Sequence, residues 1–202
     1  MPRRPVLIFA AIMLLIAAVI GGYAYMSRGP HQQQGSGVAL VGGPFSLIDQ
    51  DGRRVTEKDF LGKYILVFFG YTYCPDICPT ELQVMSAALD QMGPEAGRIQ
   101  PIFVSIDPAR DTPEVLKAYV ANFGPRLIGL TGSPEEVAAI AKAYRAYYAK
   151  AGNGSTATDY LMDHSSIIYL MGPDGRFVKH MPYTTDAAKL ATELKETLRT
   201  SP

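Results

Sequence analysis

The sequence predicts an α/β protein whose mainly parallel sheet is flanked by helices and preceded by one transmembrane helix. Two continuous apolar runs, residues 64–69 and 102–106, suit strands that are buried on both faces. A segment with apolar residues at helical spacing, TELQVMSAALDQM, lies between them. Such a β-α-β unit makes its two strands parallel, with a right-handed crossover. A charge-free stretch at residues 6–26 is long enough to span a bilayer.

Length and composition indicate one ordinary domain with an appendage. The chain has 202 residues, of which 48% are hydrophobic, and this is enough to build a core. Nineteen basic and nineteen acidic side chains cancel. Because no basic patch is visible, we expect no nucleic-acid partner.

The N-terminal 26 residues predict a membrane anchor. Arg3 and Arg4 precede the apolar stretch and should stay in the cytoplasm, while Tyr23 and Tyr25 suit the opposite interface. The prediction is a single-pass protein of the inner (cytoplasmic) membrane with its domain on the periplasmic side. A cleaved secretory signal is the alternative, and it would deliver the domain to the same side.

A tether and one domain follow the anchor. Residues 27–43 are rich in Gly, Gln and Ser and lack periodicity, so they predict a flexible linker. His31 lies in this linker and is interpreted as a solvated residue, because a flexible segment holds no fixed ligand geometry. Residues 44–202 then form the globular domain.

Turn and capping residues mark the elements in the first half of the domain. The Asp51-Gly52 pair predicts a β-hairpin. After the second apolar strand, Asp111 or Thr112 is expected to cap a helix that has Pro113 at its first position.

The second half of the domain begins with a capping box. Ser133 and Glu136 form this box, and the helix that it starts is predicted to extend through Ala149. Composition and turn residues predict four further elements: a strand at 127–130, an exposed loop at 152–158, a hairpin turning at 173–175 and a closing helix at about 185–200.

Both cysteines of the chain lie in the loop between the first apolar strand and its helix. The helix is expected to begin with Cys78 at the N-cap and Pro79 at its first position. The N-terminal end of a helix favours thiolate over thiol, so at least one cysteine should have a lowered pKa. The element order, with a CxxxC at the first crossover, predicts a thioredoxin-like fold with an N-terminal β-hairpin and a strand-helix insertion.

His164 is predicted to lie near the two sulfurs. The strand that begins at Ser165 should run antiparallel to the strand before Cys74, which brings its start beside the loop of the cysteines. Two thiolates and an imidazole suit copper, as Cu(I) or Cu(II), whereas structural zinc would need a fourth ligand. Asp163 either orients the imidazole ring or faces solvent. His180 is interpreted as structural.

Three segments resemble the Sco/SenC family of membrane-anchored copper proteins that help to assemble cytochrome c oxidase: CPDICP, SIDPARDTPEVLKAY and DYLMDHSSIIYLMGPDG. The similarity runs from Pro44 to about Met181 and includes the N-terminal anchor. It implies a thioredoxin-like fold with Cys74, Cys78 and His164 as copper ligands.

The resemblance also implies a task and partners. The protein would deliver copper to the CuA centre of oxidase subunit II, or reduce the cysteines of that subunit beforehand. A copper donor protein and a thiol reductant would be further partners. Tyr73 departs from the family pattern, in which histidine often precedes the first cysteine; this position is not among the three ligands.

Other functions use the same residues. A thiol-disulfide oxidoreductase would use Cys74 and Cys78 as a redox pair without metal. Against it, the spacing is CxxxC instead of CxxC, and His164-Ser165 stands where a thioredoxin brings a cis-proline. A peroxiredoxin would need threonine where Tyr71 stands. A redox or copper sensor stays open, and so does the question of whether the protein is an enzyme.

The segment SIDPARDTPE follows the second apolar strand at the same end of the sheet as the cysteines. An ion pair between Arg110 and a carboxylate, Asp107 or Asp111, could order this loop for the site. Capping of the next helix explains Asp111 equally well.

Overall fold

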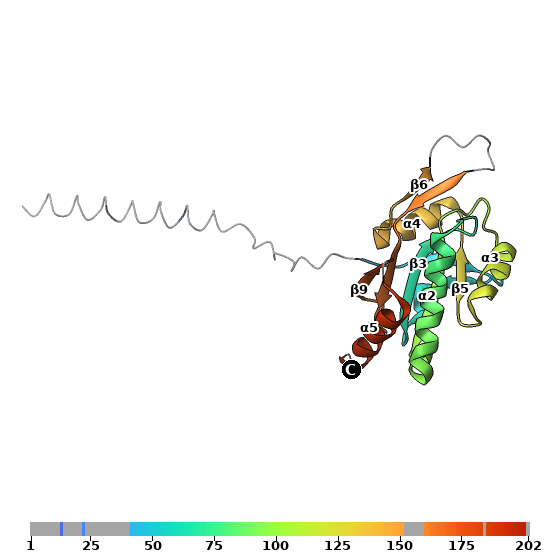
Figure 1. Cartoon of the computed structure of the whole chain (residues 1–202). Helices are drawn as coiled ribbons and strands as arrows, with labels where there is room; N and C mark the ends of the chain where they lie inside the picture. The colour runs from blue at the N-terminus through green and yellow to red at the C-terminus, as the bar shows by residue number, and fades with distance from the viewer. Residues whose placement is uncertain (1–12, 14–21, 23–40, 152–159, 184, 201–202) are drawn as a thin grey trace, which may run out of the picture. The chain divides into compact units, whose positions relative to one another are not determined.

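The computed structural model describes residues 13, 22, 41–151, 160–183 and 185–200. Within these residues the core is a seven-stranded sheet with the strand order β2-β1-β5-β4-β3-β8-β9 (Figure 1). The strands are β1 (Ser46–Asp49), β2 (Arg54–Thr56), β3 (Tyr64–Gly70), β4 (Ile99–Ser105), β5 (Ile128–Thr131), β8 (Ile167–Met171) and β9 (Phe177–Pro182).

Strand β3 lies near the centre of this sheet and is buried along its whole length. It pairs in parallel with β4, where Phe68 lies opposite Phe103. On its other side it pairs antiparallel with β8, where Phe68 lies opposite Ile168. The parallel β-α-β unit and the antiparallel neighbour are therefore both as predicted.

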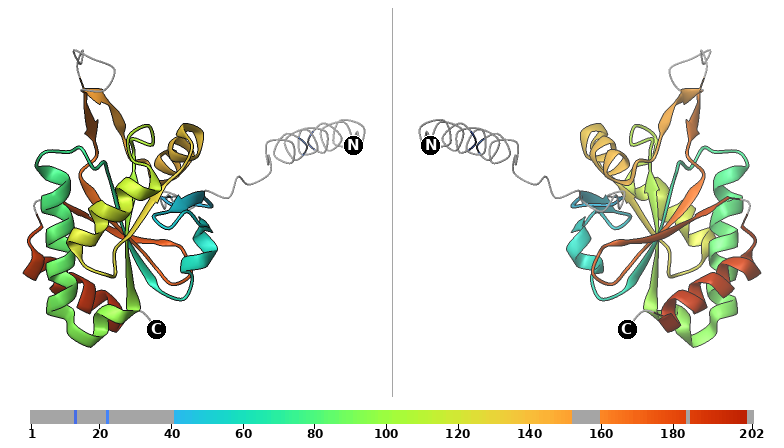
Figure 2. Two further views of the ribbon diagram at one scale, coloured as in Figure 1. Left: turned by 90° about the vertical axis from the view of Figure 1, so that its right-hand side faces the viewer. Right: turned by 90° about the vertical axis from the view of Figure 1, so that its left-hand side faces the viewer.

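Helices cover both faces of the sheet. Figure 2 shows α2 (Ile77–Met92) and α5 (Ala187–Thr200) on one side, with α3 (Pro113–Val120) and α4 (Pro134–Tyr144) on the other. The described part of the domain also has three short 3-10 helices: η1 (Glu57–Phe60), η2 (Gly93–Arg98) and η3 (Ala121–Phe123). The α/β class and the thioredoxin-like arrangement are confirmed.

Most of the predicted membrane anchor and most of the linker lie outside the described residues. Among the residues that are described, no helix is long and apolar enough to cross a membrane.

The two predicted helix starts are confirmed in detail. Thr112 is the N-cap of α3, and its hydroxyl accepts a hydrogen bond from Val115 N at 3.4 Å. Ser133 and Glu136 form the capping box of α4, with distances of 3.2 and 2.8 Å for the two reciprocal bonds. Asp111 does not cap α3, since its carboxylate has other partners.

The prediction that the fourth helix extends through Ala149 is wrong. Helix α4 ends at Tyr144, because Arg145 adopts a left-handed conformation with φ 56°. The chain then forms β6 (Tyr148–Ala151), which pairs antiparallel with β7 (Leu161–His164). Strand pairing with a distant segment overrides the alanine-rich helical pattern here. The loop predicted at 152–158 lies outside the described residues.

The β6–β7 hairpin matters because it carries His164. It projects beyond the end of the main sheet (Figure 1), at the end where the β3–α2 loop lies. Tyr148 pairs with His164 at the last position of the ladder. The hairpin thereby brings a histidine from late in the chain to the loop that contains the cysteines.

Candidate metal centre

The structure brings Cys74, Cys78 and His164 together. Cys74 lies in the loop after β3, Cys78 in the first turn of α2 and His164 at the end of β7. One ligand atom from each residue, two sulfurs and a ring nitrogen, lies within 4.8 Å of the others. Among the described residues this is the one cluster of at least three metal-ligating side chains.

Cys78 lies slightly deeper in its helix than predicted. Asp76, not Cys78, is the N-cap of α2, and Pro79 is the third helical residue instead of the first. The reason is that helical hydrogen bonding already begins at Asp76, whose carbonyl accepts from Thr80 N at 3.2 Å. The sulfur of Cys78 is buried against Gly70, where an added Cβ would approach it to 2.7 Å. Glycine at the end of β3 therefore makes room for this sulfur.

Cys74 is the partly exposed member of the pair. Its sulfur accepts a hydrogen bond from the backbone N–H of Cys78 at 3.3 Å. The hydrogen bond from the Cys78 thiol, the nearby His164 side chain and backbone N–H groups lower the pKa of Cys74 to about 3, against the opposing effect of burial. The same contact with Cys74, together with burial, raises the pKa of the Cys78 thiol. The predicted lowering of one cysteine pKa therefore falls on Cys74.

This asymmetry predicts selective alkylation by iodoacetamide. Thiolate is the reactive form, and a pKa near 3 leaves Cys74 ionised at every pH above about 5. The rate at Cys74 should therefore stay nearly constant from pH 5 to 8, where an ordinary thiol slows about tenfold per pH unit. Mass spectrometry of the reduced protein measures this rate, and Cys74→Ser should leave Cys78 almost unmodified. A rate that falls tenfold per unit would contradict the assignment.

The ring of His164 is fixed by its neighbours. It makes edge contacts with Phe68 and Tyr71, with ring centroids 6.0 and 6.1 Å apart. Nδ1 lies 3.3 Å from the carbonyl oxygen of Ser165, which can only accept, so this nitrogen carries the proton. Nε2 then directs its lone pair to Cys78 Sγ, 3.3 Å away. The imidazole is thus in the tautomer that a metal ligand requires.

Asp163 and His180, which were also considered from the sequence, are not part of the ligand cluster. Asp163 is exposed and precedes His164 on a strand, so the two side chains point to opposite faces. The solvent-facing interpretation of Asp163 is therefore favoured. His180 is exposed on β9, where its ring stacks on Phe177. His31 lies outside the described residues.

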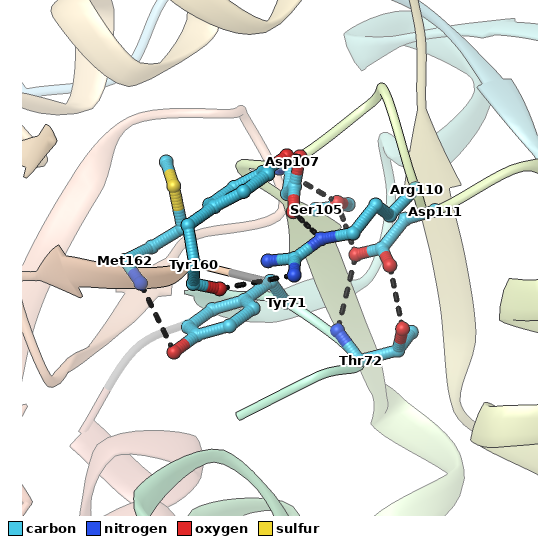
Figure 3. A network of polar contacts seen from close by, with 8 residues as sticks. All are labelled: Tyr71, Thr72, Ser105, Asp107, Arg110, Asp111, Tyr160 and Met162. Carbon is cyan, nitrogen blue, oxygen red and sulfur yellow. Dashed lines mark hydrogen bonds and ion pairs between the residues drawn. The ribbon is translucent and has the colours of Figure 1, made fainter. Parts of the chain in front are cut away.

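A buried carboxylate fixes the loop that leads to Cys74 (Figure 3). Asp111 is fully buried and accepts hydrogen bonds from Thr72 N at 3.1 Å and from Thr72 Oγ1 at 2.5 Å. Its second oxygen also accepts from Ser105 Oγ, at the end of β4, at 2.5 Å. Asp111 therefore ties the loop after β3 to the loop after β4 through hydrogen bonds from Thr72 and Ser105, which differs from the ion pair with Arg110 that was considered from the sequence.

Arg110 connects the loop after β4 to the hairpin that carries His164. Its Nε donates to Asp107 at 2.5 Å and its Nη1 to the carbonyl of Tyr160 at 3.0 Å. The guanidinium also lies over the rings of Tyr160 and Tyr73, 3.8 and 4.7 Å from their centroids. The predicted Arg–carboxylate pair therefore exists, with Asp107 as the partner (Figure 3).

Sequence reasoning missed the aromatic residues of this network. Tyr160 donates its hydroxyl proton to Asp107 at 2.7 Å, and the hydroxyl of Tyr71 accepts from Met162 N at 3.1 Å. Tyr71 thereby bonds to the middle of β7, two residues before His164. Its position directly after β3 was a signal that it lies near the site, but no sequence pattern pairs it with Met162.

An open cavity of about 310 Å³ gives access to the centre. Cys74, His164 and Tyr71 line it, together with Asp76 and Ile77 at the start of α2. A metal ion, or a loop of another protein, can therefore reach the Cys74 sulfur from outside.

Fold and site together define a thioredoxin-like protein with a thiol and imidazole cluster at the carboxyl end of its central strand. The chain belongs to the SCO1/SenC family, because the model of that family matches residues 33–199.

Known proteins agree with this assignment. The chain is 47% identical over 165 residues to the mitochondrial Protein SCO1 homolog 1 of Arabidopsis thaliana. This match covers 81% of this chain and 49% of that protein. The chain thus matches about half the length of this relative. The crystal structure of Arabidopsis thaliana ScoI with copper bound is 46% identical, with a TM-score of 0.75, and covers 80% of this chain and 99% of that one.

A more distant structure adds a functional description. BsSco, described as a member of the Sco family of cytochrome c oxidase assembly proteins with a disulfide switch, is 25% identical. It covers 84% of this chain and all of its own, with a TM-score of 0.63.

Proposed function

We propose that the protein is a copper metallochaperone that binds one copper ion through Cys74, Cys78 and His164. The observation that carries this proposal is the convergence of two sulfurs and an imidazole lone pair within 4.8 Å. Thiolate sulfur suits Cu(I), and the added nitrogen allows Cu(II) to be held as well. A solved relative with copper bound supports the choice of metal.

The proposed client is the CuA centre of cytochrome c oxidase subunit II. The description of BsSco as a member of a family of oxidase assembly proteins supports a role in oxidase assembly. Copper would arrive from a donor protein and leave by stepwise exchange of ligands, starting at the accessible Cys74. Because a disulfide between the cysteines would prevent binding, a thiol reductant is needed to keep the site competent.

The proposed location is the periplasmic side of the inner membrane. The apolar stretch at residues 6–26 and the preceding Arg3 and Arg4 support a single-pass anchor, with residues 44–202 as the copper-binding domain. Residues 27–43 would then act as a tether that lets this domain reach a membrane-embedded client.

A thiol-disulfide oxidoreductase that reduces the cysteines of subunit II is the second candidate. The ionised, accessible Cys74 beside a buried Cys78 thiol favours it, because this is the arrangement of an attacking and a resolving cysteine. A sensor of redox state or copper would use the same pair.

Copper transfer to a purified apo CuA domain of subunit II tests the first candidate against the second. The reduced, Cu-loaded protein should assemble the CuA chromophore in a client whose cysteines are already reduced, and His164→Ala should lose most of this activity. An oxidoreductase would instead act on the oxidised client without copper and would tolerate His164→Ala. Absorption spectroscopy follows the first reaction, and thiol labelling follows the second.

A further inference from the structure

A second cavity, of about 270 Å³, lies beside the proposed metal centre. It lies between the first turns of α2 and the segment that leads into α5. We call it the acidic cleft, and the side chains that define it are Asp76, Ile77, Glu81, Tyr183, Thr185 and Asp186. Asp76 and Ile77 also line the cavity against Cys74 and His164, so the two cavities are direct neighbours.

The most unusual group in the acidic cleft is the carboxyl of Glu81. This residue is only 1% exposed, and its Oε2 has no hydrogen-bond partner among the described residues. Thr185, 2% exposed, likewise presents a hydroxyl that is unpartnered within the described part of the chain. Buried polar groups without a protein partner cost stability unless water or a ligand from outside the chain satisfies them. Burial also raises the pKa of Glu81 to about 7.

The charge of the acidic cleft favours a cation. Asp76 is the N-cap of α2, but its side chain accepts no capping hydrogen bond. Asp186 uses one oxygen to accept from Lys189 N at 2.8 Å. No lysine or arginine side chain is among those that line the described cleft. Both helices begin at this point and their dipoles favour anions, yet the carboxyl groups of Asp76 and Asp186 alone outweigh two half charges, and Glu81 adds a further negative charge when it is deprotonated.

The walls of the acidic cleft indicate what kind of cation fits. Ile77 and Tyr183 flank it, and because they are 40% and 55% exposed they offer apolar surface beside the carboxyl groups. A hydrated metal ion gains nothing from such walls. A lysine or arginine side chain does, because it combines an apolar stem with a cationic head.

We propose that the acidic cleft binds a lysine or arginine side chain of the protein that exchanges copper with Cys74. This inference rests on the proposed function, since it requires a docking partner. The cationic side chain would pair with Glu81 while the partner's metal ligands face the neighbouring cavity. Because the same two residues, Asp76 and Ile77, border both cavities, one docked segment can occupy both.

A titration with n-butylguanidinium, which mimics an arginine side chain, tests the acidic cleft without any partner. The full-length protein, labelled with ¹⁵N and held in detergent micelles, should show saturable amide shifts at Ile77, Glu81 and Asp186. Glu81→Gln should weaken this binding about tenfold, whereas Glu196→Gln, an exposed carboxylate near the far end of α5, should not change it. Equal shifts with neutral n-butylurea, shifts that survive in Glu81→Gln, or binding of inorganic phosphate instead would overturn the proposal.

A second measurement identifies the occupant. The apo CuA domain of subunit II is titrated into the Cu-loaded full-length protein, and its affinity and rate of copper uptake are recorded. Glu81→Gln should bind copper normally, yet dock and transfer about tenfold more weakly at low salt. If the variant transfers as well as the native protein, the proposed docking role is wrong while the metallochaperone stands. If the native protein transfers no copper, the proposed metallochaperone function is wrong. The assignment of a copper-exchange partner to the acidic cleft is then wrong as well.

Discussion

Replacing His164 by alanine is expected to weaken Cu(II) binding by roughly 100-fold, while Cu(I) binding falls much less. The reason is that two thiolates alone satisfy Cu(I), whereas Cu(II) needs the nitrogen donor as well. In the structure Nε2 already lies 3.3 Å from Cys78 Sγ and the ring is held by its neighbours, so little free energy is needed to orient it. Competition titrations with chelators of known affinity measure both constants.

His180→Ala is the matched control for this prediction. His180 is an exposed histidine on β9 whose ring stacks on Phe177, apart from the metal centre. Its removal should change neither affinity by more than about twofold, the scale expected for a residue outside the ligand set. Equal Cu(II) affinities for the native protein and His164→Ala would show that the imidazole is not a ligand.

Replacing Asp111 by alanine is expected to lower the free energy of unfolding by about 3 kcal/mol. The substitution leaves the buried Ser105 hydroxyl and two half-buried donors of Thr72 without their acceptor. Burial already raises the pKa of Asp111, so part of its contribution is offset by desolvation. Urea denaturation of the metal-free protein measures the loss.

Two further observations make the Asp111 prediction specific. Glu95→Ala removes an exposed carboxylate and should change stability by less than about 0.5 kcal/mol. Hydrogen exchange at Thr72 N should also accelerate more in Asp111→Ala than exchange within β3, because the acceptor of that amide is lost. A fully stable Asp111→Ala protein would contradict the role given to this carboxylate.

The sequence predicted those parts of the fold whose stabilising forces are local or periodic. Strand β3 is continuously apolar, and the capping box at Ser133 is a contact across three residues. Both are readable without knowing the rest of the structure. The β6–β7 hairpin is different. The residues after Tyr144 continue a helical pattern, and only pairing of Tyr148 with His164 decides that they form a strand. Such long-range pairing leaves no local signal.

The candidate site divides in the same way. Cys74 and Cys78 were found from their spacing, and His164 from the expected antiparallel neighbour of β3. The network behind them was not found, because Tyr71 bonds to Met162 and Arg110 to Tyr160, fifty or more positions away. The unusual environment of Glu81 could not be predicted for another reason. In sequence it is one more polar residue of a helix, and only its burial makes it unusual.

X-ray absorption spectroscopy of the copper-loaded protein tests the central claim most directly. After one equivalent of copper is added to the reduced protein, the native spectrum should fit two sulfur donors and one nitrogen donor. His164→Ala should lose the nitrogen, and Cys74→Ser one sulfur. A native protein that retains no copper after desalting, or whose copper shows no sulfur donors, would contradict the assignment of Cys74, Cys78 and His164 as the ligands. Rapid disulfide exchange in the same preparation would then favour the oxidoreductase.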